Sequence, residues 1–240
     1  MKRKRDNWTE TSLKILMIPI LLVGIFLFLN GLIMPFLSER LTKEHLLSNY
    51  SIEELAENQK KSSEYDYEGV SYLTSLSLLQ SQAKDMVEKD KVPVVGDIVI
   101  PSVNIHLPIV KGISQYYLSI GAGEMRPEEK MGVHNYSLAS HNFNDDRILF
   151  SPLRHINIGD KVYLSDKRNV YVYEVDDKEY VTPTQISVIE EGKKNKITLV
   201  TCSMSGKTRL VVTGPLVKTY SWAKTPGNVK DYFLGGRNDR

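Results

Sequence analysis

Residues 196–213 read KITLVTCSMSGKTRLVVT, and this stretch decides the fold. Two runs rich in β-branched and aliphatic residues, 197–202 and 208–212, flank a short polar connection that contains Gly206. Runs of this composition are typical of strands, and a short connection with a glycine favours a hairpin. The pattern therefore predicts two paired strands, with Cys202 at the end of the first and Arg209 near the start of the second.

Cys202 is the only cysteine in the chain. A single thiol excludes an intramolecular disulfide and a multi-cysteine metal site. An isolated cysteine is most often a small buried hydrophobe, but the predicted hairpin favours a chemical role. Cross-strand neighbours approach to about 5 Å, and a cation at that distance from a thiol favours the thiolate, which is the nucleophilic form.

A thiol nucleophile needs a group that carries its proton, and histidine is the usual one. His141 ends the alternating run 136–141 and precedes the turn-forming run 142–146, a strand-end position of the kind at which scaffolds hold catalytic groups. The pattern ranks His141 first and leaves as alternatives the four other histidines, which have simpler structural or surface interpretations: His45, His106, His134 and His155.

The region 93–220 consists of short β-rich runs separated by turn residues, a pattern typical of an all-β barrel or sandwich. The predicted strands are 97–100, 104–110, 136–141, 161–164, 170–175, 179–181, 196–202 and 208–213. The last segment, 221–240, is polar and carries Gly235 and Gly236, so we expect a loosely held tail.

Residues 15–37, ILMIPILLVGIFLFLNGLIMPFL, contain no charged side chain. A run of this length predicts a transmembrane anchor, because a helix of about 20 residues crosses the hydrocarbon core. The apolar region of a cleaved signal peptide is only about 7–15 residues long, which disfavours that alternative. Four basic residues at 2–5 place the segment 1–14 in the cytoplasm and everything after the anchor outside the cell.

Residues 38–92 are rich in Glu, Lys, Ser, Leu and Gln, with apolar residues at roughly helical intervals. We expect two helical pieces broken near 61–67, forming an extracellular tether between the anchor and the domain. A spacer is the simpler role for this segment, and partner binding is the alternative. The basic charge gathers at the extreme N-terminus instead of on the folded part, which excludes a nucleic-acid-binding function.

Three groups of residues resemble the sortase family. The run Thr198-Leu199-Val200-Thr201-Cys202 resembles the TLxTC signature of sortases, and Arg209 follows at a short spacing. The run NYSLASHN at 135–142 is similar to the strand that carries the sortase histidine. Further similar stretches, GDIVIP at 96–101, 118–123 and LFSPL at 149–153, follow in order over about 92–220. The chain most resembles the class A, housekeeping type of Gram-positive bacteria.

This resemblance implies a closed sortase-type β-barrel of about eight strands with short helices, preceded by the transmembrane helix and the tether. It also implies a cysteine transpeptidase. Cys202 would attack a Leu-Pro-x-Thr-Gly-like sorting signal between Thr and Gly, forming a thioester that an amine of a cell-wall precursor of lipid II type resolves. His141 would carry the protons, and Arg209 would hold the substrate and stabilise the oxyanion.

The substrates would be surface proteins that carry a C-terminal sorting signal. The same resemblance implies a peptide groove lined by Thr201, Ala139, Ser140 and Leu118. Ile186 and Val188 are weaker candidates for this groove and are more readily explained as barrel core. Some sortases bind calcium, but a solvated acidic surface explains the candidate ligands equally well, so neither a metal nor another cofactor is predicted. Those candidates are Glu124, Glu128, Glu129, Glu190 and Glu191.

Two alternatives come from other functional classes. A non-enzymatic, membrane-tethered β-domain that binds wall proteins would tolerate Cys202→Ala. A secreted cysteine hydrolase would use the same residues but would finish the reaction with water, and an added glycine-based amine would separate it from a transpeptidase.

Overall fold

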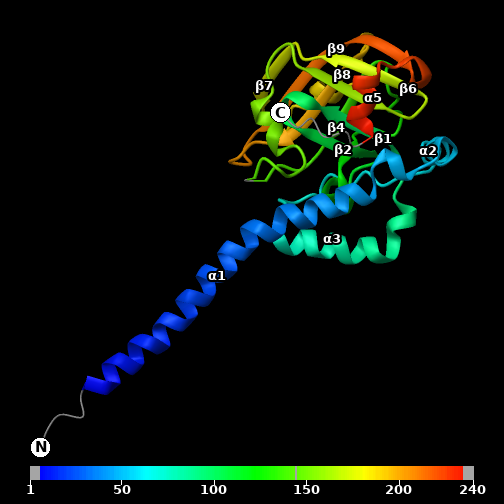
Figure 1. Cartoon of the computed structure of the whole chain (residues 1–240). Coiled ribbons are helices and arrows are strands. Elements are labelled where there is room, and N and C mark those ends of the chain that lie inside the picture. The colour runs from blue at the N-terminus through cyan, green and yellow to red at the C-terminus, as the bar shows by residue number, and fades with distance from the viewer. Residues whose placement is uncertain (1–5, 144, 235–240) are drawn as a thin grey trace, which may run out of the picture.

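The computed structural model describes residues 6–143 and 145–234, apart from the side chains of 6–13 and 26–32 in the first helix. A β-barrel lies at one end of the long helix α1 (Asp6–Glu44), which projects away from it (Figure 1). Helix α3 (Ser75–Glu88) lies beside the barrel end of α1 (Figure 1).

Eight strands close the barrel in the order β6-β5-β1-β2-β3-β4-β8-β9, and β9 pairs again with β6. The ninth strand, β7, pairs with the first part of β9. The predicted closed barrel of about eight strands is confirmed, and each predicted run overlaps one of the observed strands. The strands are β1 (Val94–Ile100), β2 (Ile105–Val110), β3 (Ala122–Glu124), β4 (Asn135–Ala139), β5 (Lys161–Ser165), β6 (Asn169–Glu174), β7 (Asp177–Val181), β8 (Lys196–Cys202) and β9 (Arg209–Ser221).

Strand β3 escaped the sequence analysis because its three residues are too few to show a side-chain alternation. Short helices connect the strands and cover the barrel, as expected. They are α2 (Ile52–Asn58), α4 (Gln115–Ile120), α5 (Gly227–Phe233) and the 3₁₀ turns η1 (Leu47–Asn49), η2 (Lys89–Lys91), η3 (Pro101–Val103), η4 (Ser151–His155), η5 (Ile186–Ile189) and η6 (Trp222–Lys224).

The barrel closes because β9 changes partners along its length. Its first half, Arg209 to Thr213, pairs with β7, and its second half, from Leu216 on, pairs with β6. Gly214 lies at the change, where a β-carbon would overlap the backbone of Glu174. Only glycine permits this close approach of two backbones.

The segment 38–92 does not stand free of the barrel. Leu41, Leu47 and Leu55 are buried in the same hydrophobic core as the barrel interior. The buried His45 bonds Asp85 of α3 through Nε2 at 2.6 Å, and the Tyr116 hydroxyl of α4 donates to the same carboxylate at 2.7 Å. Helix α2 ends at Asn58 and α3 begins at Ser75, so the expected break in helix is present, but the helices are part of the fold.

The C-terminal stretch differs from the loose tail that its polar composition suggested. Helix α5 buries Val229 and Phe233, four residues apart on one face, against the core. Two apolar side chains at helical spacing are enough to dock this turn of helix. Residues 235–240 lie outside the described part of the chain.

Within the described residues, no helix is both long enough and apolar enough to cross a membrane. The anchor predicted over 15–37 lies within α1, and the side chains of 26–32 lie outside the described residues. Met34, near the end of the predicted anchor, is buried against the core, and the Leu37 carbonyl accepts a hydrogen bond from Gln82 of α3.

Glu124 is a carboxyl group enclosed in the barrel. The Tyr136 hydroxyl donates to its Oε1 at 2.7 Å, while Oε2 is buried without a partner among the described residues. Burial raises the pKa of Glu124 from 4.5 to about 8, the Tyr136 hydrogen bond lowers it, and the nearby Glu129 raises it further. The folded protein therefore holds this carboxyl protonated at neutral pH.

We predict that this group makes the protein less stable as pH rises. The carboxyl of Glu124 loses its proton near pH 4.5 in the unfolded chain and near pH 8 in the folded protein. The free energy of unfolding is therefore highest below pH 4.5 and falls between these two pH values. Glu124→Gln should remove most of that fall, measured as Tm from pH 4.5 to 8.5. The exposed Glu128→Gln is the matched control, and a pH profile unchanged by Glu124→Gln would contradict the assignment.

Candidate active site

The parallel pairing of β4 with β8 brings His141 and Cys202 together. The register runs from Asn135 opposite Lys196 to Ala139 opposite Val200. Beyond the strands it is extended by Ser140 N, which donates to Val200 O at 3.2 Å, and by Thr201 Oγ1, which donates to Ser140 O at 2.8 Å. Continued to the next pair, the register sets His141 beside Cys202, at the spacing of about 4.8 Å between neighbouring strands.

The predicted hairpin of β8 and β9 is present, and it pairs Cys202 directly with Arg209. The half-buried Arg209 guanidinium donates from Nη1 to the carbonyls of Gly206 and Thr208, at 3.2 and 3.3 Å. None of the salt bridges among the described residues involves Arg209, so no carboxylate of this part of the chain neutralises it. The Cys202 thiol therefore lies between β4, which leads to the His141 imidazole, and β9, which begins with the Arg209 guanidinium.

His141 is buried, and burial lowers its pKa from 6.5 to about 4, while a hydrogen bond to the backbone of Gln115 raises it. A bond that favours the protonated ring is one that the ring donates, so the Gln115 carbonyl accepts it. Nε2 is buried and has no hydrogen-bond partner among the described residues. A neutral imidazole is the form that can accept a proton.

A segment that we call the strap, residues 62–74, passes along this end of the barrel. Its backbone bonds Ile113 twice, through Asp66 N and Glu64 O, both at 2.8 Å. Ser71 N donates to Gln115 Oε1 at 2.9 Å, and the backbone of Gln115 raises the pKa of His141. The ring of Tyr72 lies against Gly206, where a β-carbon would overlap it. The polar composition of the strap gave no signal of this position.

Asn142 is a residue that the sequence analysis passed over as part of a turn. Its Nδ2 donates to the backbone carbonyl of Cys202 at 2.7 Å and lies 3.6 Å from Met204 Sδ. The residue thus ties the end of the His141 strand to the end of the Cys202 strand. Its only signal in the sequence is its place next to the histidine.

The predicted groove residues have mixed surroundings. Thr201 and Ser140 are buried, and their hydroxyls donate to the backbone, Thr201 to Ser140 O and Ser140 to Gly121 O. Leu118 is buried in α4, and Ala139 is partly exposed at the end of β4. The expectation of barrel core is wrong for Ile186, which is 68% exposed on η5, because that turn stands outside the barrel wall. Val188 packs on Val200 and its neighbours.

The acidic residues weighed as calcium ligands do not form one group. Glu129, which lies near Glu124, is buried and bonded by Arg126, and Glu191 bonds His134 at the surface. Among the side chains that the structure describes, no three of His, Cys, Asp or Glu are grouped to hold a metal ion.

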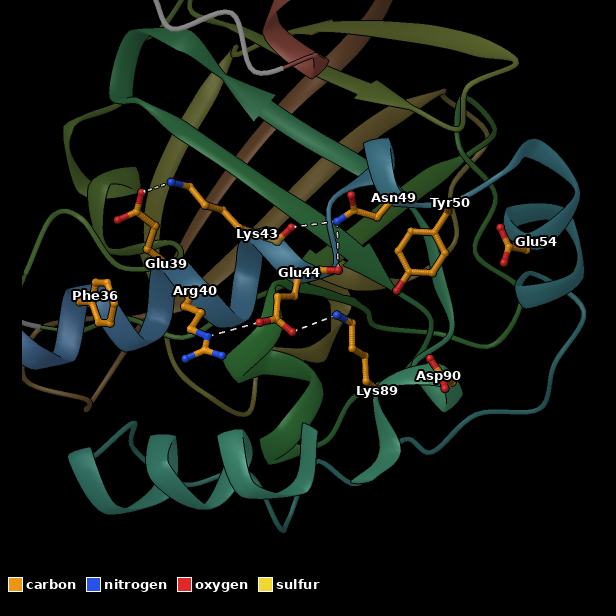
Figure 2. A pocket seen from close by; sticks show the side chains of 10 residues that line it. All are labelled: Phe36, Glu39, Arg40, Lys43, Glu44, Asn49, Tyr50, Glu54, Lys89 and Asp90. Carbon is orange, nitrogen blue, oxygen red and sulfur yellow. Dashed lines mark hydrogen bonds and ion pairs between the residues drawn. The ribbon is translucent and has the colours of Figure 1, made fainter. Parts of the chain in front are cut away.

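An open pocket of about 830 Å³ lies elsewhere, along the end of α1, η1 and η2 (Figure 2). Most of the charged side chains that line it are paired, with Glu44 bonding both Arg40 and Lys89. It includes none of the three residues at the barrel rim.

A thiol, an imidazole and a guanidinium at one rim of a closed barrel are the parts of a cysteine-dependent acyl-transfer enzyme. The sortase domain model matches residues 98–217. Sortase A of Listeria monocytogenes is 34% identical over 213 residues, covering 88% of this chain and 94% of the relative. Sortase A of Streptococcus agalactiae is 36% identical over 239 residues, covering 97% and 95%.

The crystal structure of Listeria monocytogenes sortase A superposes with a TM-score of 0.56 at 36% identity, covering 60% of this chain and 99% of that one. The chain belongs to the sortase family, the cysteine transpeptidases of cell-wall anchoring, and it is an enzyme. The alternative of a non-enzymatic binding domain is thereby excluded.

We predict that His141 stays neutral from pH 5 to 8 and titrates at about 4. The imidazole takes up a proton near pH 6.5 in the unfolded chain but not in the folded protein. His141 therefore lowers the free energy of unfolding as pH falls below 6.5. NMR of histidine-labelled protein, with His141→Gln to assign the signal, measures the titration. A midpoint near 6.5 would show that the ring is open to solvent.

We also predict that Asn142→Ala lowers kcat by up to about tenfold, because one hydrogen bond of about 0.5–1.5 kcal/mol then no longer fixes the Cys202 carbonyl. The measurement is cleavage of a sorting-signal peptide at saturating substrate. Asn157→Ala, in an exposed turn, is the control. Equal activity in Asn142→Ala and the wild type would show that the contact does not position the thiol.

Proposed function

We propose that this sortase cleaves a Leu-Pro-x-Thr-Gly-like sorting signal between Thr and Gly and joins the upstream protein to an amine of a cell-wall precursor of lipid II type. The observation that carries the proposal is the convergence of Cys202, His141 and Arg209 at the adjoining ends of β8, β4 and β9. No other cysteine is available as the nucleophile.

In the first half of the reaction, the thiol proton of Cys202 passes to the free Nε2 of His141 as sulfur attacks the Thr carbonyl. A C–S bond forms and the C–N bond to Gly breaks. The same proton then moves from His141 to the leaving amine, so the downstream peptide departs neutral and a thioester remains. A ring whose pKa lies near 4 gives up this proton readily.

Arg209 stabilises the negative charge that develops on the carbonyl oxygen during attack. Its guanidinium is held by two backbone carbonyls and has no carboxylate partner among the described residues, so its charge remains available to the substrate. A fixed cation in a partly buried site is the arrangement that lowers the barrier to a tetrahedral intermediate.

In the second half, the acceptor amine attacks the thioester. A C–N bond forms, the C–S bond breaks, and the amine proton passes through His141 back to sulfur, which restores the thiol. Ala139, Ser140, Thr201 and Leu118 shape the peptide groove beside this centre. In this proposal the hydroxyls of Ser140 and Thr201 hold the strand ends in place, and Ala139 offers the open surface.

The proposed site of action is the outer face of the cell membrane of a Gram-positive bacterium, with residues 15–37 as the single anchor and the N-terminus in the cytoplasm. The support is the uncharged run itself, the basic residues 2–5 before it, and the solvent exposure of the apolar side chains from Ile15 to Ile25 on α1. The substrates are surface proteins with a C-terminal sorting signal, and no metal or cofactor takes part.

The test is cleavage of a fluorescence-quenched Leu-Pro-x-Thr-Gly peptide by the full chain in detergent, with and without triglycine. The full chain is used because 38–92 packs on the barrel. We predict that Cys202→Ala and His141→Ala lower kcat/KM at least about a thousandfold and that Arg209→Ala lowers it about a hundredfold. His155→Ala, exposed and outside the site, should retain full activity.

The product separates the remaining alternatives. A triglycine-joined peptide establishes transpeptidation, whereas a free carboxylate with triglycine present would make the chain a hydrolase. Failure of the wild type across a panel of sorting-signal peptides would overturn the proposed substrate class.

A further inference from the structure

Helix α3 exposes its apolar side chains. Leu76 is 66%, Leu79 51%, Met86 89% and Val87 80% exposed, and Ala83 between them is exposed as well. Residues at these spacings lie on one face of a helix. We call these five residues the apolar stripe.

The opposite face of α3 buries Asp85, which accepts hydrogen bonds from His45 and from the Tyr116 hydroxyl. Between this face and the stripe, the partly buried Gln82 donates to Leu37 O at 2.8 Å. Turning the helix to bury the stripe would break these bonds and leave a buried carboxylate unpaired, which is costly. The orientation is therefore fixed, and the stripe faces outward in the native fold.

The contacts also fix where the stripe lies. Gln82 opposite Leu37 and Lys89 opposite Glu44 set α3 alongside the last turns of α1, running in the same direction (Figure 2). Met86 and Val87 border the groove between the two helices together with Arg40. On α1 itself, Ile33 and Phe36 are exposed at this level. The stripe thus adjoins the end of the predicted anchor.

We propose that the apolar stripe of α3, which runs alongside α1, touches the lipid bilayer where the anchor leaves it, as a second membrane contact beside the anchor. This proposal rests on the membrane attachment included in the proposed function. The stripe presents no charged group and no hydrogen-bond donor, and Lys84 on a neighbouring face has a side chain long enough to reach the headgroups. One face of a helix of this length covers far less than the roughly 800 Å² per partner of a stable protein interface.

Two contacts constrain the barrel more than one does. An anchor helix alone leaves the barrel free to tilt on the membrane. A second contact fixes the distance of the barrel from the bilayer and its orientation. Cys202 is then held at a constant distance from the bilayer. Because the contact is apolar, it persists at high salt and does not need anionic lipid.

The experiment uses the full chain with Cys202→Ala, reconstituted in phosphatidylcholine vesicles at 0.5 M NaCl. Single cysteines at Ala83→Cys, Ile20→Cys and Thr184→Cys carry a fluorophore that is quenched by nitroxide-labelled lipid or by aqueous iodide. Thr184 follows β7, which lies on the side of the barrel away from α3 (Figure 1). We expect lipid quenching at positions 20 and 83, and at least fivefold less iodide quenching at 83 than at 184.

Each outcome decides the proposal. Lipid quenching at 20 with iodide quenching at 83 equal to that at 184 overturns the α3 contact and leaves the anchor intact. No lipid quenching at 20 overturns the anchor and the α3 contact together. Cross-linking between position 83 of two chains, without lipid quenching there, overturns the proposal in favour of contact between copies.

A pair of variants separates lipid contact from folding and catalysis. Leu79→Glu with Met86→Glu places two charges on exposed positions of the stripe and should abolish lipid quenching at 83. In the Cys202 protein the same pair should leave cleavage of a soluble peptide within twofold of the wild type. Thr182→Glu with Thr184→Glu adds the same charge at the exposed turn after β7 and should keep lipid quenching at 83. Unchanged quenching in the stripe variant would overturn the proposal.

Discussion

The parallel register of β4 and β8 is the constraint on which the rest of the site depends. Two segments 61 residues apart in the chain are aligned by backbone hydrogen bonds, and the alignment continues past Ala139 and Val200 through Ser140 and Thr201. A shift of one residue would turn every side chain of one strand to the other face. The same strand β8 then pairs with β9, so one register sets His141, Cys202 and Arg209 at a single rim.

Burial determines the protonation state of His141 at this rim. The imidazole of His141 is enclosed, which lowers its pKa to about 4 and keeps it neutral, while the backbone of Gln115 raises this pKa. In the proposed reaction, His141 therefore starts as a neutral ring and takes up the thiol proton as sulfur attacks. The Gln115 side chain also accepts a hydrogen bond from Ser71 N of the strap, so the segment before the barrel packs next to the site.

The segment between the long helix and the barrel belongs to the folded unit. Its leucines enter the common core, and the buried contacts of His45, Asp85 and Tyr116 join three elements that are far apart in the chain. Composition suggested a spacer because such contacts leave no local signature: a buried Asp or His looks like any other polar residue in a charged stretch. The outward stripe of α3 follows from the same contacts, since satisfying Asp85 and Gln82 decides which face of the helix is covered.

Eight of the nine strands, the hairpin that pairs Cys202 with Arg209, and the family could be predicted from the sequence, because side-chain alternation, turn residues and the TLVTC and SLASHN runs are local patterns. The tertiary structure decided the neutrality of His141, the burial of the Ser140 and Thr201 hydroxyls and the contact of Asn142 with Cys202. It also decided the docking of α5 and which face of α3 is exposed. The physical reason is that burial and hydrogen-bond partners depend on which distant segments cover a residue. A period of two or of 3.6 residues fixes which side chains share a face, but not what that face meets.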